Sequence, residues 1–298
     1  MTDSYSRKAR LNRLFSVSQR MAGIKVLLRL FHAAQAPAST RLRRPARSAE
    51  RRYGAVLLIG ALTGMTLAAS DPVSAQQQKR VDVLELFTSQ GCSSCPPADA
   101  LLRKLAERDD IIAISLPVSY WDHLGWKDTL AREAFNNRQY QYAKARGDRD
   151  VYTPQMVVNG LTHVVGSRHE AIESALAKTS RLLEPVTVPI KIRLQNDAVE
   201  IETGAAPAGS AYRMGQIFVV CYNSSVDVAI RRGENTGRSI SYTNVVREWL
   251  PAGKWKGEPA HFKFRIPRGE SFDAIAVLLQ ADDSRAMIGA AAIPYPSE

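Results

Sequence analysis

The stretch VDVLELFTSQGCSSCPPADALL, residues 81–102, decides the fold. Its first seven residues are rich in β-branched and apolar side chains and predict a strand. Residues 97–108 place apolar side chains at helical spacing, with Pro97 as the first helical residue. Cys92 and Cys95 therefore lie at a strand-to-helix turn, where free backbone N–H groups and the positive end of a helix favour a thiolate.

The Cys92–Cys95 pair is expected to do chemistry rather than to stabilise the chain, because a disulfide that closes so short a loop constrains the unfolded state very little. Cys92 is expected to be the exposed attacking thiol and Cys95 the buried resolving thiol. A residue before a proline is pushed out of the helical region, which applies to both Cys95 and Pro96. The prolines therefore predict a distorted first turn, and they leave open whether the two Cα atoms come within about 7 Å.

The positive charge of the chain is concentrated at its start. The 298 residues carry a net charge of +11. Residues 1–52 hold 13 Lys and Arg against 2 Asp and Glu, whereas residues 76–298 hold 27 against 26. A nearly neutral body lacks the basic surface by which proteins bind nucleic acids, so we expect no nucleic-acid partner.

The pattern of residues 1–75 predicts a basic leader that ends in an export signal. Arg51 and Arg52 precede the apolar run 54–69, and the small-x-small sequence Val73-Ser74-Ala75 follows it. The apolar run is shorter than the roughly 20 residues that span a membrane, so cleavage is the expected outcome. The mature protein is then periplasmic or secreted, and a membrane contact arises only if the leader stays uncleaved.

Residues 76–185 are expected to form an α/β domain with a central sheet flanked by helices. A short apolar strand is predicted over 111–118 and an amphipathic helix over about 127–146. Two short strands follow, joined by a hairpin at Asn159-Gly160, and a last helix runs to about residue 182. Short alternating or apolar runs separated by turn residues then predict an all-β, sandwich-like domain over 186–298.

Four segments of the chain are distinctive together: ELFTSQGCSSCPPAD (85–99), YWDHLGWKD (120–128), YTPQMVVNG (152–160) and RRGENTGRSISYTNVVREW (231–249). They resemble an exported, mainly bacterial family of thioredoxin-like proteins that is catalogued as a domain of unknown function, within the thioredoxin/glutaredoxin superfamily. The resemblance extends over about residues 81–270.

The superfamily resemblance implies roles for Thr153 and Pro154. In that superfamily a cis-proline faces the dithiol, and the residue before it pairs with the backbone of the substrate. Carried over, Pro154 is cis and Thr153 faces the substrate. Thioredoxins also bury an acid six residues before the first cysteine, a position held here by Leu86. Glu85 is one residue away and is either a buried proton relay for Cys95 or an outward-facing strand residue.

Trp121 and Asp122 follow the second predicted strand, where α/β sheets build their sites. They either line the substrate groove beside Cys92 or pack an inserted helix. Cys221 lies in an apolar run and is expected to be a buried small residue. A further polar segment is expected to form a loop that pairs the two domains, through Arg231, Arg232, Glu234, Asn235 and Arg238.

The first functional hypothesis is an exported thiol–disulfide oxidoreductase. It needs no cofactor beyond the redox disulfide Cys92–Cys95, and its partner is a protein or a small molecule that carries a thiol or disulfide. The second is a periplasmic copper-delivery protein, in which the two thiolates and either His123 or His163 hold Cu(I). The third is a non-catalytic binding module with an inert disulfide.

Overall fold

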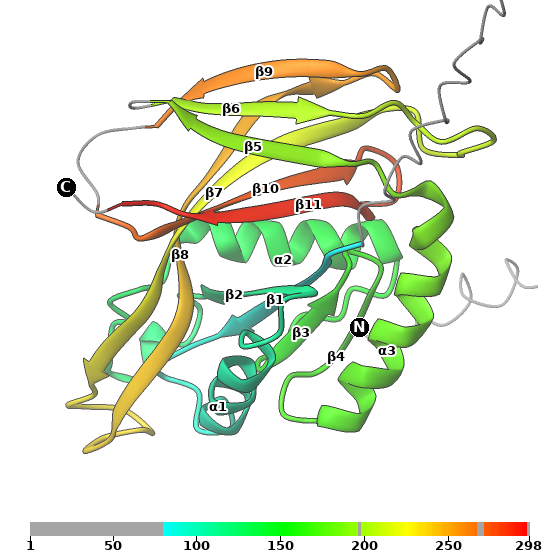
Figure 1. Ribbon diagram of the computed structural model, residues 1–298. Helices are drawn as coiled ribbons and strands as arrows, with labels where there is room; N and C mark the ends of the chain where they lie inside the picture. Colours follow the sequence, from blue (N-terminus) through cyan, green and yellow to red (C-terminus); the bar gives the residue numbers. More distant parts are fainter. Residues whose placement is uncertain (1–79, 196–197, 267–270, 297–298) are drawn as a thin grey trace, which may run out of the picture. The chain divides into compact units, whose positions relative to one another are not determined.

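The computed structural model describes residues 80–195, 198–266 and 271–296 (Figure 1). The expected leader and export signal, residues 1–75, lie outside the described residues. None of the helices that the structure describes has the length and the apolar character of a membrane span. The first part of the described chain alternates strands and helices: β1 (Asp82–Thr88), α1 (Pro96–Leu105), β2 (Ile111–Pro117), η1 (Asp122–Leu124), α2 (Glu133–Arg146), β3 (Gln155–Val158), β4 (Thr162–Val165), α3 (His169–Leu183) and η2 (Glu184–Val186).

The order of these elements confirms the α/β prediction for this part of the chain. β1 and β2 pair in parallel through the crossover helix α1, and β1 pairs antiparallel with β3 on its other side. The β3–β4 hairpin turns at Asn159 and Gly160, which both have positive φ, 51° and 71°. This is the backbone that a two-residue turn requires, and Asn-Gly is the pair that adopts it most readily.

Every element after residue 186 in the described chain is a strand, as expected, and seven of them follow in order. They are β5 (Ile190–Gln195), β6 (Ala198–Thr203), β7 (Gly215–Ala229), β8 (Ser239–Trp255), β9 (Ala260–Arg265), β10 (Ala274–Ala281) and β11 (Met287–Pro294).

Four of these strands extend the first sheet instead of forming a sheet of their own. The large sheet has the order β11-β10-β7-β8-β2-β1-β3-β4, in which β8 pairs in parallel with β2 at Ser115 and Val245. The expected division at residues 185–186 thus marks a change in the kind of element within one shared sheet. Composition reveals that change, but it does not reveal which distant strand covers the edge of β2.

The remaining strands form a small second sheet, in the order β5-β6-β9. Ile201 of this sheet belongs to the same buried cluster as Val219 of β7, Val277 of β10 and Trp255 of β8. The small sheet therefore shares a core with the C-terminal part of the large sheet, and the fold is mixed α/β with one large and one small sheet.

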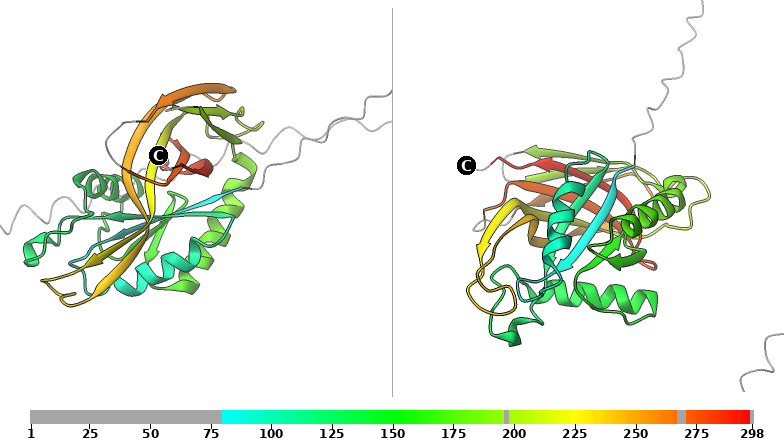
Figure 2. Two further views of the ribbon diagram at one scale, coloured as in Figure 1. Left: turned by 60° about the vertical axis from the view of Figure 1, so that its left-hand side comes forward. Right: turned by 90° about the horizontal axis from the view of Figure 1, so that it is seen from below.

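Two further large clusters of buried residues lie on opposite faces of β1, because its side chains point alternately to the two faces. Leu84 and Leu86 pack with buried residues of α1 and α3, whereas Val83 and Phe87 pack with buried residues of α2. Helices α1 and α3 therefore cover one face of the sheet and α2 covers the other (Figure 2). Glu85 shares the face of Val83 and Phe87, and so it faces α2.

The hairpin of β7 and β8 reaches beyond the sheet. The pairing of β7 with β10 ends at Tyr222, whereas the pairing of β7 with β8 continues to Ala229 and Ser239. The two strands continue as a ribbon past the rest of the large sheet (Figure 1). Arg103 of α1 donates a hydrogen bond of 2.8 Å to the Ser241 carbonyl of β8, which holds the ribbon against α1.

Candidate functional site

Cys92 and Cys95 lie in the turn between β1 and α1 and form a disulfide, with their Cα atoms 5.4 Å apart. This separation lies in the usual range for disulfides and answers the question that the two prolines raised. Cys95 is the N-cap residue and has helical dihedrals, φ −79° and ψ −36°, so α1 begins at Pro96. The expected distortion of Cys95 is absent, and the helix begins one residue earlier than predicted.

Both cysteines are buried, with exposed fractions of 2% for Cys92 and 0% for Cys95. The burial of Cys95 agrees with the prediction, and the expected exposure of Cys92 is wrong for this state of the molecule. The expected exposure of Cys92 followed from the local sequence of the β1–α1 turn alone. In the folded chain two further segments pack on that turn, residues 120–128 and residues 230–238.

The Thr153-Pro154 peptide bond is cis, which confirms the prediction for Pro154. Trp121 donates a hydrogen bond of 2.8 Å from its indole nitrogen to the Thr153 hydroxyl. The same residue lies against the dithiol turn, because a Cβ atom at Gly91 would come within 3.0 Å of the Trp121 Cβ. Trp121 therefore links the turn that carries the cysteines to the turn that carries Pro154.

The carboxylate of Asp122 acts inside its own loop, where it accepts a hydrogen bond of 3.0 Å from the Asp128 N–H. Asp128 in turn accepts a bond of 2.7 Å from the N–H of Gln90, in the dithiol turn. The indole of Trp126 donates to the Gln90 side chain at 2.8 Å. Asp122 thus shapes the loop that holds the dithiol turn in place, and no hydrogen bond or ion pair joins its carboxylate to either cysteine.

Glu85 is fully buried, but on the face of the sheet opposite to α1. Its carboxylate forms an ion pair with Arg138 at 2.6 Å and accepts a hydrogen bond from the Tyr142 hydroxyl. Both partners lie on α2. The proposed proton relay between Glu85 and Cys95 is therefore wrong, because adjacent strand residues face opposite sides and Glu85 falls on the wrong side.

A different buried acid, which the sequence analysis missed, lies one helical turn after Cys95. Asp99 is 3% exposed, and its N–H donates to the Cys95 carbonyl at 3.1 Å. Burial raises the pKa of the Asp99 carboxyl to about 7, the nearby Thr88 hydroxyl opposes this rise, and the Asp128 carboxylate adds to it. The sequence signal was the spacing Cys95-x-x-x-Asp99, which places both residues on the same side of a helix.

Asp99 belongs to a cluster of buried polar groups from four separate parts of the chain. The carboxylate of Asp99 and the hydroxyls of Thr88 and Tyr242 are buried, and apart from the contact of Asp99 with Thr88 they make no hydrogen bond with the described residues. Burial raises the pKa of Tyr242 far above its ordinary value, and the Asp99 and Asp128 carboxylates add to the rise. Buried polar groups are rarely left unpaired, and such exceptions often mark functional sites.

The polar loop expected between the two halves of the chain does contact the dithiol turn, through two of its five predicted residues. Asn235 donates hydrogen bonds to the carbonyls of Gln90 and Cys92, at 3.0 and 2.9 Å. The Glu234 carboxylate accepts a bond of 3.1 Å from the Ser93 N–H.

The residues named for copper binding do not gather around the cysteines. His123 interacts with the Tyr120 carbonyl at 2.8 Å, and His163 lies 3.2 Å from the Asp148 carboxylate. In the described part of the chain, the group of three metal-type ligands that lie close together is Asp148, Asp150 and His163, without a cysteine. Cys221 is buried as expected, and burial raises its pKa to about 12, with a contribution from Glu248.

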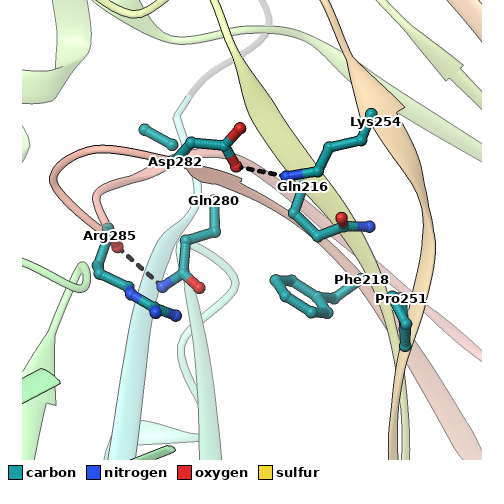
Figure 3. A pocket seen from close by; sticks show the side chains of 8 residues that line it. Gln216, Phe218, Pro251, Lys254, Gln280, Asp282 and Arg285 are labelled. Atoms are coloured by element: carbon teal, nitrogen blue, oxygen red, sulfur yellow. Dashed lines mark hydrogen bonds and ion pairs between the residues drawn. The ribbon is translucent and has the colours of Figure 1, made fainter. Parts of the chain in front are cut away.

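A pocket of about 260 Å³ lies at the other end of the large sheet, lined by residues that include Gln216, Phe218, Gln280 and Arg285 (Figure 3). Two interactions frame it, the Lys254–Asp282 ion pair and the hydrogen bond from Gln280 to the Arg285 carbonyl, both 2.9 Å. None of the residues predicted for the site lines this pocket.

A family model described as "Protein of unknown function (DUF1223)" matches residues 83–280. No curated protein matches the chain significantly.

Solved structures similar to the chain include the following two. One is a crystal structure of a protein from Agrobacterium tumefaciens, with 34% sequence identity and a TM-score of 0.62, and the match covers 72% of this chain and 95% of that one. The other is HBP35 of Porphyromonas gingivalis, with 13% identity and a TM-score of 0.47, covering 72% of this chain and 75% of that one.

Proposed function

The chain belongs to the family described as "Protein of unknown function (DUF1223)", and from its site we propose that it is an exported thiol–disulfide oxidoreductase. The observation that carries the proposal is the placement of a disulfide at the N-terminus of α1, linked through Trp121 to the cis Thr153-Pro154 turn. A helix N-terminus stabilises a thiolate, which is the reactive form in exchange. Export rests on the sequence of the leader, and it would place the site where disulfides persist.

We propose that residues 81–183 form a thioredoxin-like unit. Its support is the order of elements, β1-α1-β2 in parallel followed by α2, the β3–β4 hairpin and α3. The position of the dithiol between β1 and α1 and the cis-proline immediately before β3 agree with that assignment.

In the proposed reaction the Cys92 thiolate attacks one sulfur of a substrate disulfide. A mixed disulfide forms, and the other substrate sulfur leaves as a thiolate. Cys95 then loses its proton and attacks the Cys92 sulfur, which forms the Cys92–Cys95 disulfide and releases the second substrate thiolate. Two electrons pass from the dithiol to the substrate, solvent protonates the released thiolates, and the reverse sequence oxidises a substrate dithiol.

Asp99 is the proposed acceptor of the Cys95 proton. It lies one turn along α1 from Cys95, is buried with it, and has a pKa of about 7. A base with a pKa near the working pH takes up a proton and gives it back with little cost. The groups that act on its carboxylate are the Thr88 hydroxyl and the Asp128 carboxylate, and neither is a cation that would hold it in the ionised form.

Thr153 is the proposed contact for the backbone of the substrate. Neither its N–H nor its carbonyl makes a hydrogen bond with another described residue. An unpaired backbone segment next to a reactive sulfur can pair with an extended substrate, as strands do when they add to a sheet edge.

One observation favours a second candidate, a binding module with an inert disulfide. Cys92 is 2% exposed, and a disulfide that partners cannot reach does not exchange with them. The two candidates share the fold and differ in whether Cys92 reacts.

The oxidoreductase proposal predicts which cysteine is captured by a substrate. When Cys95→Ala is mixed with a peptide disulfide, Cys92 is expected to attack and to remain as a stable mixed disulfide, because the resolving thiol is gone. Intact-mass measurement should show one added peptide per protein molecule. Cys92→Ala, treated in the same way, should show none, and an adduct on Cys95 alone would reverse the assigned roles.

A further inference from the structure

The tip of the β7–β8 hairpin, residues 230–238, is a self-contained loop that covers the dithiol turn. It is closed by two backbone hydrogen bonds of 2.9 Å, from Ile230 N–H to the Arg238 carbonyl and from Gly237 N–H to the Ile230 carbonyl. The loop is thus closed on itself, and β7 and β8 join it to the large sheet. We call these nine residues the tip.

The tip is held on the dithiol turn by polar contacts. Asn235 is 1% exposed, and its amide nitrogen donates to the carbonyls of Gln90 and Cys92. Glu234 accepts a hydrogen bond from the Ser93 N–H. Gly233 lies against Trp126, where an added Cβ would come within 3.2 Å of the Trp126 Cβ.

Little apolar surface opposes displacement of the tip. The buried hydrophobic residue of the tip is Ile230, which lies at its base. The four charged residues of the tip are all exposed. Hydrogen bonds exchange with water at a small net cost compared with apolar burial. Displacing the tip from the turn would therefore break hydrogen bonds without exposing much apolar surface, and with the tip in place Cys92 is 2% exposed.

The tip pairs with backbone groups of the dithiol turn. They are two carbonyl acceptors, on Gln90 and Cys92, and one N–H donor, on Ser93. Asn235 supplies a donor amide and Glu234 supplies an acceptor. An extended peptide carries the same two kinds of group along its backbone, whereas a small thiol carries few of them.

We propose that the tip occupies the place of a substrate backbone, and that a polypeptide disulfide must displace it before Cys92 can react. The substrate of the site is then a polypeptide rather than a free small thiol, and Asn235 determines access to Cys92. This inference rests on the proposed exchange function, and it adds the class of substrate and the residues that select it.

The first test measures access to Cys92 in the reduced protein. The protein is alkylated with iodoacetamide at a pH above which the alkylation rate no longer increases. Peptide mapping then distinguishes Cys92 from Cys95 and Cys221. Asn235→Ala loses two hydrogen bonds and is expected to react roughly tenfold faster at Cys92. Asn235→Asp replaces the donor amide with a carboxylate, which cannot donate to the two carbonyls. Its Cys92 should react at least as fast as that of Asn235→Ala.

Arg238→Gln is the matched control, because its side chain makes no hydrogen bond or ion pair with the described residues. It should stay within about twofold of the original protein, since surface changes away from contacts have small effects. Unchanged Cys92 alkylation in both Asn235 variants would overturn the inference. Alkylation needs only a free thiol, so this outcome is independent of whether the protein exchanges disulfides with partners.

The second test compares two substrates with the same reacting bond. One is oxidised glutathione, and the other is a ten-residue peptide joined to glutathione through its single cysteine. The original protein should react roughly tenfold faster with the peptide, and Asn235→Ala should lose most of that preference because its tip no longer blocks the small substrate. Equal rates for both substrates in the original protein would refute the polypeptide assignment.

Discussion

Replacing Asp99 with asparagine is expected to slow the release of the mixed disulfide by roughly 100-fold at pH 7, because the Cys95 proton loses its acceptor and a positioned base contributes about 10²–10⁴ to such a step. In the original protein the rate should rise with pH and level off near the pKa of Asp99, which is about 7. The variant should lose that inflection. Stopped-flow measurement of the second step between pH 5 and 9 gives both the rate and the profile.

Although Asp99→Asn is expected to slow the reaction, it is expected to raise the stability of the folded protein above neutral pH. The folded-state pKa of Asp99, about 7, lies above the ordinary value of 3.8, so the folded protein holds a proton that the unfolded chain has already released. Stability contributed by the protonated group is therefore lost as pH rises from about 4 to about 7, by up to about 4 kcal/mol. Asparagine does not ionise, so Asp99→Asn should be more stable than the original protein at pH 8.

Asp109→Asn is the control, because Asp109 is exposed and lies beyond the end of α1. It should change neither the pH profile of exchange nor the pH dependence of urea unfolding. If Asp99→Asn keeps the inflection near pH 7 and resolves the mixed disulfide at the original rate, Asp99 is only a buried structural residue.

Replacing Arg138 with methionine is expected to lower the free energy of unfolding by about 3–5 kcal/mol, because it leaves the fully buried Glu85 carboxylate without its ion-pair partner. Arg138 also donates to the Tyr142 hydroxyl at 2.7 Å and lies 3.6 Å from the centre of the Trp249 ring. These contacts join β1 to α2 and to β8, so their loss affects both halves of the large sheet. Urea unfolding at pH 7 measures the change.

Two further variants separate a buried charge from an ordinary ion pair. Replacing both partners, Glu85→Leu with Arg138→Met, removes the unpaired charge and should recover most of the lost stability. Arg193→Ala breaks a pair with Glu202 in which the side chains are 63% and 41% exposed, and it should cost less than about 1 kcal/mol. A similar cost for Arg193→Ala and Arg138→Met would contradict the account of the buried pair.

The features that the sequence predicted correctly depend on local patterns. The strand before Cys92, the helix after Cys95 and the turn at Asn159-Gly160 each follow from the residues in one short window. The cis Pro154 came from resemblance to a superfamily, through the residues beside it. Local chemistry determines these features, so they can be predicted without knowledge of the rest of the fold.

The features that the sequence did not predict depend on contacts between distant segments. The alternation of β1 left two possible faces for Glu85, and only the position of Arg138 on α2 decides between them. The hydrogen bond from Asn235 to the Cys92 carbonyl joins residues more than a hundred positions apart in the chain. The sequence shows that Asp99 follows Cys95 by four residues. It does not show that β8 brings Tyr242 into the cluster of buried polar groups around Asp99.

The reduction potential of the Cys92–Cys95 disulfide tests the central claim most directly. The protein is equilibrated with glutathione buffers of graded potential, and the fraction of reduced dithiol is measured by alkylation and mass. A dithiol that exchanges with partners should titrate between about −270 and −120 mV, the range covered by known thiol–disulfide oxidoreductases. A disulfide that stays intact down to about −300 mV would be structural, and it would contradict the proposed function.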